Sequence, residues 1–253
     1  MPKAVHTPVA EPYHWKARVK KDLDRDVRLG IIEKVPQNCP VNWLSRMVIA
    51  PKPGTGEPRR TVDLQRVNEA TKRLTHHTRS PHDLVVSIPT NTRKTTLDAW
   101  NGYHALPLAE EFKDATQFIT EWGRFRYCQA PQGFHASGDG YTKRCDDIIT
   151  EEKIERVLKC IDDACLHNDT IEENFWATVR YIEVCGKNGI VFNPSKFVFC
   201  REEIDFAGFT VTKDGYKPTV KLIEAIENFP LPTNLTGIRS WFGLVQQLSL
   251  IHI

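Results

Sequence analysis

Apolar and polar positions recur along the chain with two periods, which predict both helices and strands. Residues 13–29 have the pattern of an amphipathic helix that ends at Gly30. Two short strands are predicted at Val48–Ala50 and Thr61–Leu64, on either side of a Pro- and Gly-rich turn. The basic stretch over residues 63–82 is expected to be irregular.

The middle of the chain predicts short strands, one helix and two tight hairpins. One strand, Thr95–Leu97, ends on an aspartate, and a hairpin through Trp122-Gly123 pairs residues 118–119 with 124–127. A helix is expected over 138–150. The segment RVLKCIDDACL that starts at Arg156 places two acidic residues between two apolar runs, which is the pattern of a tight β-hairpin.

The last third predicts two helices and a strand between them. Thr170 and Glu173 have the spacing of a capping box, and the helix that they begin is expected to end at Asn188-Gly189, with Phe175, Val179 and Ile182 on one face.

A strand is expected over Ile204–Val211, turned by Lys213-Asp214-Gly215, and Asn234 can cap a final helix. The apolar face of that helix is formed by Ile238, Trp241, Phe242, Val245 and Leu248. Strands and helices mix without strict βαβ alternation, so the predicted fold class is α+β.

Composition narrows the class of protein. The 253 residues, 40% hydrophobic and 26% charged, allow one large domain or two small ones. No apolar run is long enough to predict a membrane span, and the N-terminus lacks the apolar segment of a secretion signal. Seven cysteines without a C-x-x-C pair predict reduced thiols in an intracellular protein.

Charge is distributed unevenly. Residues 1–96 contain 18 Lys and Arg against 9 Asp and Glu, a net charge of +9, and the remainder contains 16 against 23, a net charge of −7. A basic N-terminal third suits a polyanion such as nucleic acid or a nucleotide. Ordinary surface charge is the alternative interpretation.

Two adjacent carboxylates, Asp162 and Asp163, are the first candidate for chemistry. Aspartate is common in turns, so each alone is explained by the hairpin. Together they repel by about 1 kcal/mol at ~4 Å in water, and a divalent cation would relieve that cost. Asp98, at the end of a strand, is a candidate third ligand. Two cations held in this way would stabilise the attacking and leaving oxygens of a phosphoryl transfer.

Basic residues on the first predicted hairpin are candidates for phosphate contacts. Lys52, Arg59 and Arg60 lie on either side of its flexible turn and could converge on phosphate oxygens. Solvated surface charge is again the alternative.

These motifs together resemble the reverse transcriptases of long-terminal-repeat retrotransposons, most closely the gypsy type. The resemblance runs from about Glu11 nearly to the C-terminus, in the same order and spacing as in that family. Eight sequence elements carry it: WLSRMVIAPKPG, RRTVDLQRVN, LDAWNGYHALPL, APQGFHASGDGYTK, KCIDDACL, NGIVFNPSKF, IDFAGFTVTKDG and NFPLPTNLTGIRSWFGL.

The resemblance implies a two-metal polymerase site. Asp98 matches the first catalytic aspartate of the family, and Asp162 and Asp163 match the aspartate pair of its hairpin. These three residues would bind two Mg²⁺ ions, with Mn²⁺ as an alternative, Asp98 and Asp162 most directly.

It also implies a set of nucleotide-binding residues. Lys52 and Arg59 match the residues that clamp the triphosphate, and Tyr103 matches the position that excludes a ribose 2′-hydroxyl. Gln132 matches a glutamine that contacts the sugar, and Lys196 matches a lysine near the leaving pyrophosphate.

The implied fold is the right-hand polymerase: palm, fingers and a partial thumb. Phe206, Ala207 and Gly208 match the strand that positions the primer end, and the last helix resembles the first thumb helix. The expected divisions are an N-terminal arm and fingers over 1–73, palm over 74–105, fingers over 106–136, palm over 137–213 and the start of the thumb over 214–253.

Some positions depart from the family pattern. Cys160 stands where tyrosine is common before the aspartate pair, Gln65 where arginine is usual, and Ala105 where glutamine is common. None of these removes a metal ligand. The sequence stops at Leu250–Ile253, inside the expected thumb, without the RNase H and integrase portions, so we expect a fragment or a decayed copy.

The function expected from the resemblance is RNA-directed DNA synthesis. Its partners would be an RNA or DNA template with a primer, and deoxynucleoside triphosphates, with no membrane partner, in a cytoplasmic particle or the nucleus. Two alternatives belong to other classes: a non-catalytic nucleic-acid-binding remnant, and an unrelated metal-dependent nuclease or binding module.

Overall fold

The structure is a computed structural model that describes residues 4–5, 7–10, 12–52, 54–73, 75–100 and 102–249. The side chain of Leu248 and the final residues Leu250–Ile253, which were named above, lie outside the described part. The chain forms two compact units, residues 1–76 with 101–146 and residues 77–100 with 147–253.

The first unit is built on a five-stranded sheet. Its elements are η1 (Tyr13–Trp15), α1 (Lys16–Arg28), β1 (Ile32–Val35), β2 (Ser45–Pro51), β3 (Pro58–Val62), α2 (Gln65–Ala70), η2 (Gly102–Ala105), α4 (Glu110–Lys113), η3 (Asp114–Thr116), β5 (Phe118–Thr120), β6 (Gly123–Tyr127) and most of α5 (His135–Glu151). The strand order is β1-β6-β5-β2-β3, and every neighbouring pair is antiparallel except β2 and β5.

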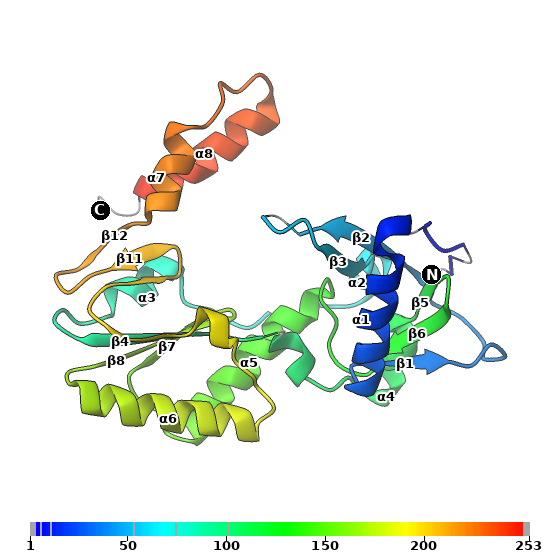
Figure 1. The fold of residues 1–253 in the computed structure, drawn as a ribbon, viewed down its shortest axis with the longest axis horizontal. Helices are drawn as coiled ribbons and strands as arrows, with labels where there is room; N and C mark the ends of the chain where they lie inside the picture. Colours follow the sequence, from blue (N-terminus) through cyan, green and yellow to red (C-terminus); the bar gives the residue numbers. More distant parts are fainter. Residues whose placement is uncertain are drawn as a thin grey trace. The chain divides into compact units, whose positions relative to one another are not determined.

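Helix α1 packs against this sheet through one apolar face. Val19 and Leu23, four residues apart, are buried with Phe118, Phe125 and Tyr127 from the sheet. Side chains four apart lie on the same face of a helix, so this spacing fixes which side of α1 meets the strands. Figure 1 shows α1 lying beside β1 and β3.

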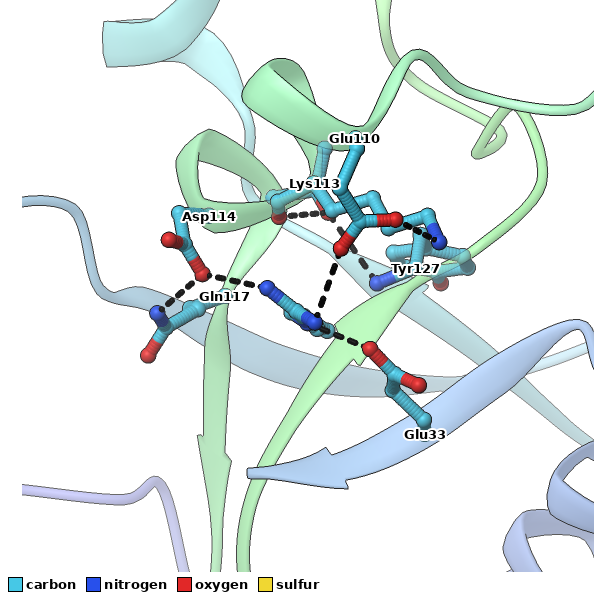
Figure 2. A network of polar contacts seen from close by, with 8 residues as sticks. Glu33, Glu110, Lys113, Asp114, Gln117 and Tyr127 are labelled. Atoms are coloured by element: carbon cyan, nitrogen blue, oxygen red, sulfur yellow. Dashed lines mark hydrogen bonds and ion pairs between the residues drawn. The ribbon is translucent and has the colours of Figure 1, made fainter. Parts of the chain in front are cut away.

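A network of charges ties the connection before β5 to the sheet (Figure 2). The Arg126 guanidinium on β6 donates to Glu33 at 2.5 Å, to Asp114 at 2.8 Å and to Glu110 at 3.2 Å. Lys113 pairs with Glu110 at 2.6 Å. Burial opposes a charged Arg126, but hydrogen bonds and charge from Asp114 and Glu33 outweigh it and raise the pKa of the guanidinium.

The second unit contains two antiparallel sheets. Its elements are α3 (Pro81–Val86), β4 (Arg93–Asp98), β7 (Val157–Cys160), β8 (Asp163–Asn168), α6 (Ile171–Lys187), η4 (Pro194–Lys196), β9 (Val198–Arg201), β10 (Ile204–Phe206), β11 (Phe209–Val211), β12 (Tyr216–Pro218), α7 (Val220–Glu227) and α8 (Leu235–Ser249). The strand orders are β7-β8-β4-β9 and β10-β11-β12.

Helix α6 packs against the four-stranded sheet, along which it lies in Figure 1. The predicted capping box at Thr170 is present, because Glu173 N–H donates to the Thr170 hydroxyl at 3.1 Å and the Glu173 carboxylate accepts from Thr170 N–H. The buried residues of α6 include Asn174, whose amide donates to Asn168 Oδ1 and to the backbone of Arg93. By contrast Phe175 and Ile182, predicted on one apolar face, are exposed.

The three-stranded sheet differs from the single strand predicted over Ile204–Val211. Phe206 pairs with Phe209, so the chain reverses through Ala207 and Gly208, with φ of 52° and 84°. Positive φ at both central residues is the geometry of the tightest hairpin loops. The prediction was wrong because apolar residues with strand-like spacing lie on both sides of the turn, and alanine gives no turn signal.

Several short helices were not predicted. Residues 63–82 include α2 and the start of α3, and Val220–Glu227 forms α7, which packs against α8. Asn234 caps α8 as predicted, accepting from Gly237 N–H at 2.8 Å. Elsewhere the predicted hairpins and the α+β class are confirmed.

Within the described residues, no helix combines the length and the apolar character needed to cross a membrane.

Candidate active site

Two of the predicted carboxylates meet across neighbouring strands of the second unit. Asp98 is the last residue of β4 and Asp163 the first of β8, and the two are direct partners in the antiparallel register. Directly opposed Cα atoms of such a pair lie about 4.5–5.5 Å apart. The structure therefore brings together residues that are 65 positions apart in sequence.

Asp162 lies in the turn that joins β7 to β8. Cys160 pairs with Asp163, so Ile161 and Asp162 form a two-residue loop, and Ile161 takes a φ of 55°. A β-branched residue rarely takes a positive φ, and such strain is concentrated at functional sites. The loop is fixed to β4 by Ala99 N–H, which donates to the Asp162 carbonyl at 2.8 Å.

The carboxylates are held in an environment that disfavours their charge. Burial raises the pKa of Asp162, and the Asp98 charge adds to that effect against Lys159 and Lys196. Burial also raises the pKa of Asp163, again reinforced by Asp98. A nearby cation or a bound proton therefore stabilises each of these two groups at this position.

Lys196 supplies one cation. Its ammonium group lies 2.7 Å from Asp98 Oδ2, and this contact raises the pKa of the lysine. The lysine ends the short helix η4, whose start is capped by Asn193 through Ser195 N–H and Ser195 Oγ. Asn193 N–H in turn donates to the Asp98 carbonyl at 2.8 Å, so β4 and the lysine are joined through the backbone as well.

The donor set suits a divalent cation. Asp162 Oδ1 is buried and has no hydrogen-bond partner among the described residues. Hard carboxylate oxygens are the ligands that Mg²⁺ prefers. Within the described part of the chain, however, no three His, Cys, Asp or Glu side chains are already arranged around one metal position. Ion binding would require these side chains to rearrange. The Asp98 oxygen would have to be released by Lys196.

The first unit brings together two predicted nucleotide-binding residues. Arg59 Nη2 donates to Gln132 Oε1 at 3.3 Å. Lys52 lies on the same β2–β3 hairpin as Arg59, and its N–H donates to the Glu57 carbonyl at 2.7 Å across the turn. Lys52 and Arg59 are exposed, as side chains that bind a soluble ligand must be. Arg60, the third candidate on this hairpin, is 12% exposed and pairs with Asp26 instead.

Asn68 holds the turn that contains Gln132, a role that the sequence did not suggest. Its amide donates to the Gly133 carbonyl at 2.8 Å and its Oδ1 accepts from His135 N–H at 3.0 Å. Gly133 takes a φ of 92° in this turn. The only signal in the sequence was that Asn68 closes one of the eight matching elements.

Tyr103 packs on a second tyrosine. Its ring meets the ring of Tyr141 edge-on, with centroids 5.8 Å apart, and it is half-buried. A Cβ on Gly102 would lie 2.6 Å from Cζ of the buried Tyr141, so only glycine allows this approach. Gly102 and Tyr141, neither of which was singled out from the sequence, therefore determine where Tyr103 lies.

The predicted primer-positioning residues form the β10–β11 hairpin. Phe206 is buried with Leu84 and Val85 of α3, whereas Ala207 and Gly208 make the turn. His82 Nε2 lies 3.0 Å from the Tyr216 hydroxyl and supports the same sheet from α3. The hairpin is thus anchored on its apolar side and presents its turn outward.

Sequence comparison relates this chain to retroelement polyproteins. It is 28% identical over 239 residues to the retrovirus-related Pol polyprotein from transposon gypsy of Drosophila melanogaster, covering 89% of this chain and 22% of that protein. The corresponding protein from transposon opus of the same fly is 26% identical, covering 92% and 23%. The Pro-Pol polyprotein of simian foamy virus type 1 is 26% identical, covering 91% and 19%. The chain thus spans roughly a fifth of these relatives.

Solved structures show the same fold. The foamy viral protease-reverse transcriptase dRH in complex with double-stranded DNA superposes with a TM-score of 0.87 at 21% identity, over 97% of this chain and 42% of that one. The foamy viral protease-reverse transcriptase in complex with an RNA/DNA hybrid gives a TM-score of 0.82, also at 21% identity, over 96% of this chain and 32% of that one.

Residues 50–211, which include all three aspartates, match the family described as reverse transcriptase (RNA-dependent DNA polymerase). This chain belongs to the reverse transcriptase family and has its polymerase fold.

Proposed function

We propose that this chain adds deoxynucleotides to a primer end under the direction of an RNA or DNA template. The observation that carries the proposal is the pairing of Asp98 with Asp163 across β4 and β8, beside the unpartnered carboxylate oxygen of Asp162. Family members are RNA-directed DNA polymerases, which generally use divalent metal ions.

Asp98, Asp162 and Asp163 would hold two Mg²⁺ ions, or Mn²⁺. Bound there, the ions would lower the charge on the attacking and leaving oxygens of the phosphoryl transfer. Lys196 would move from Asp98 towards the departing pyrophosphate, since its long, exposed side chain is free to change rotamer. The hairpin turn at Ile161-Asp162 would hold its carboxylate in place by its constrained backbone.

Residues of the first unit would bind the nucleotide. Arg59 and Lys52 would contact the triphosphate, and the Arg59–Gln132 hydrogen bond would set the distance between triphosphate and sugar contacts. The edge-on packing of Tyr103 against Tyr141 would fix the ring that rejects a 2′-hydroxyl.

The partners would be a template–primer duplex and deoxynucleoside triphosphates. Foamy viral relatives with this fold have been solved with double-stranded DNA and with an RNA/DNA hybrid. We place the palm at residues 74–105 and 137–213, the fingers at 1–73 and 106–136, and the start of the thumb at 214–253. We propose a cytoplasmic particle or the nucleus as the location of this activity.

Template-directed extension tests the proposal. A primer annealed to RNA is incubated with the chain, Mg²⁺ or Mn²⁺, and one nucleotide at a time. We expect addition only of the nucleotide complementary to the template, and loss of addition in Asp162→Asn. Asp205→Asn, which changes an aspartate on β10 instead, is the matched control and should retain addition. Binding of the duplex without any addition would favour a non-catalytic nucleic-acid-binding protein.

Arg59 provides a test of the nucleotide site. Arg59→Ala should raise the nucleotide concentration needed for half-maximal addition by about tenfold or more, since hydrogen bonds between charged groups contribute roughly 1.5–3 kcal/mol. Affinity for the template–primer should change little. Equal weakening of both would instead make Arg59 a general backbone contact. Lys34→Ala, which removes an exposed cation from β1, is the control.

A further inference from the structure

Helix α1 carries a row of basic residues on its outer side. Arg18, Lys21, Arg25 and Arg28 follow one another at intervals of three, four and three residues. At 100° per residue these positions fall within an arc of about 80°, and they run about 15 Å along the axis. The arc lies almost opposite the buried Val19 and Leu23. We call these four residues the basic row.

The basic row carries more charge than its neighbours neutralise. It lines a hollow of about 160 Å³ together with one acid, Asp22. Asp22 lies 3.2 Å from Arg25 and 3.5 Å from Arg18, and Arg25 also pairs with Asp26 at 2.9 Å. Lys21 and Arg28 have no ion-pair or hydrogen-bond partner among the described residues.

The other cations of α1 are neutralised. Lys16 pairs with Glu121 at 2.6 Å, and Lys20 pairs with Asp24 four residues on. Excess positive charge is therefore confined to the outer row of the helix. Two further acids reach the row: Glu57 lies 3.8 Å from Arg18, and Asp26, which pairs with Arg25, is shared with Arg60.

Helix stability does not account for this row. Cations near a helix C-terminus complement its dipole, which would explain Arg25 and Arg28. Arg18 and Lys21 lie in the first half of α1, where the dipole favours acids, yet its first turn has none. Like charges three or four residues apart also repel. Asp22 offsets this repulsion at Arg18 and Arg25, but no described acid offsets it at Lys21 and Arg28, which points to a ligand of opposite charge.

The chemistry of that ligand follows from the row. Arginine binds phosphate oxygens through a planar pair of donors, and lysine binds them as a point charge. A single line of cations, about 4.5–6 Å apart along the helix axis, matches one chain of successive phosphates. We propose that the basic row of α1 binds the phosphate backbone of single-stranded nucleic acid. The choice of ligand rests on the proposed function, since an unpaired template strand is what such an enzyme copies.

Binding of a labelled oligonucleotide tests this proposal without nucleotide or metal. Fluorescence anisotropy of a fluorescein-labelled 15-residue oligouridylate is measured with the full chain from 50 to 250 mM salt. Each phosphate contact contributes about 0.7 to the slope of log affinity against log salt for single strands. Lys21→Gln/Arg28→Gln should therefore reduce the slope by about 1.4 and the affinity at 0.1 M salt by about ten- to thirty-fold.

A matched double variant on the same helix is the control. Lys16→Gln/Lys20→Gln removes the same charge from side chains 40% and 41% exposed that lie off the row. It should leave the slope close to that of the unchanged protein. Equal losses in both double variants would overturn the proposal, because binding would then follow net charge alone. A poly-glutamate competitor of equal charge that displaces the oligonucleotide as well as unlabelled oligouridylate does would also overturn it, in favour of an acidic protein partner.

Two further measurements separate this inference from the proposed function. Crosslinking of a 4-thiouridine strand should map to peptides containing Lys21, and a map without α1 would contradict the proposal. Asp162→Asn should bind the oligonucleotide normally while failing to extend a primer. If the unchanged protein extends a primer but the Lys21→Gln/Arg28→Gln variant binds the oligonucleotide as well as it does, only the inference about the basic row is contradicted. If the unchanged protein binds the oligonucleotide through the basic row but extends no primer, only the proposed function is contradicted.

Discussion

At the scale of the residue, the half-buried position of Asp162 and the partial desolvation of the more exposed Asp163 disfavour the charge that metal binding needs, and so lower stability. Burial raises the pKa of both carboxyls, so the folded state binds protons more readily than the unfolded chain does. The resulting destabilisation is fully present above the folded-state pKa and is absent below the unfolded-state pKa, which is about 3.9. Carboxylates kept at a position that lowers stability in this way are typical of sites that bind a ligand through their charge.

Asp162→Asn should consequently stabilise the metal-free protein at pH 7 by a few degrees in Tm. The asparagine keeps the shape of the side chain and removes the buried charge. The gain should shrink as the pH falls and disappear below about pH 4, where the aspartate is protonated in both states. Thermal unfolding of both proteins in EDTA across this pH range measures it, and a gain of equal size at pH 3 and pH 7 would refute the explanation by charge.

Lys196 competes with a metal ion for Asp98. Its ammonium group lies 2.7 Å from the carboxylate and occupies an oxygen that a cation would need. A unit charge ~4 Å from a divalent ion costs about 2 kcal/mol in water before screening by salt. Removing the charge should favour the ion.

Lys196→Met should therefore bind Mn²⁺ about three- to tenfold more tightly, as measured by electron paramagnetic resonance of the free ion. Nucleotide addition by the same variant should be slower, because the pyrophosphate would lose a counter-charge. Lys187→Met removes an exposed lysine at the end of α6 and should leave Mn²⁺ affinity unchanged. Weaker Mn²⁺ binding by Lys196→Met would show that the lysine supports the ion instead.

At the scale of the element, the charge network of Figure 2 fixes the turn between α4 and β5. Arg126 binds three carboxylates from β1, α4 and η3 with a side chain that is 24% exposed. Hydrogen bonds between charged groups are stronger than neutral ones, and networks exceed isolated pairs in effect. The network therefore holds the connection that leads into the sheet of the first unit.

Arg126→Met should lower the free energy of unfolding by about 1–3 kcal/mol, since three carboxylates lose their shared cation. Lys16→Gln, which removes one exposed pair with Glu121, should cost less than about 0.5 kcal/mol. Urea denaturation of both variants at low and high salt compares them. Equal, small losses would mean that the network contributes no more than its separate surface pairs.

Elements with a local signal were predicted from the sequence, and those held by distant contacts were not. The Thr170 capping box, the 118–127 hairpin and the acidic hairpin each lie within a few residues of their own signal. Helix α2 lacks such a signal, and Asn68 within it is bonded to residues 65 and 67 positions away. The turn at Ala207-Gly208 was missed because its alanine takes a conformation that its side chain does not favour.

At the scale of the whole molecule, the resemblance to retroelement polymerases was recognised from eight ordered sequence elements, and the family match over residues 50–211 confirms it. The assembly of Asp98 with Asp163 depends on strand register, which a one-residue slip would destroy. Supporting residues such as Tyr141 and Asn193 could not be predicted, because their roles exist only once distant segments pack. The assigned roles of the site residues stay predictions until they are tested.

Exposed apolar residues on α8 give the molecule a surface that can associate with other molecules. Trp241 and Phe242, on the apolar face predicted for this helix, are 41% and 60% exposed. Exposed apolar faces promote association. Activity measurements therefore need a parallel check of the oligomeric state.

Direct detection of metal at the three aspartates tests the central claim most closely. Mn²⁺ is titrated into the metal-free protein with a primer-template and a non-hydrolysable deoxynucleotide, and the free ion is followed by electron paramagnetic resonance. We predict two bound ions per chain, and at most one in Asp98→Asn and in Asp162→Asn, with Asp205→Asn unchanged. Two bound ions in all four proteins would contradict the account, because the metal would then be bound away from β4 and the Asp162-Asp163 hairpin.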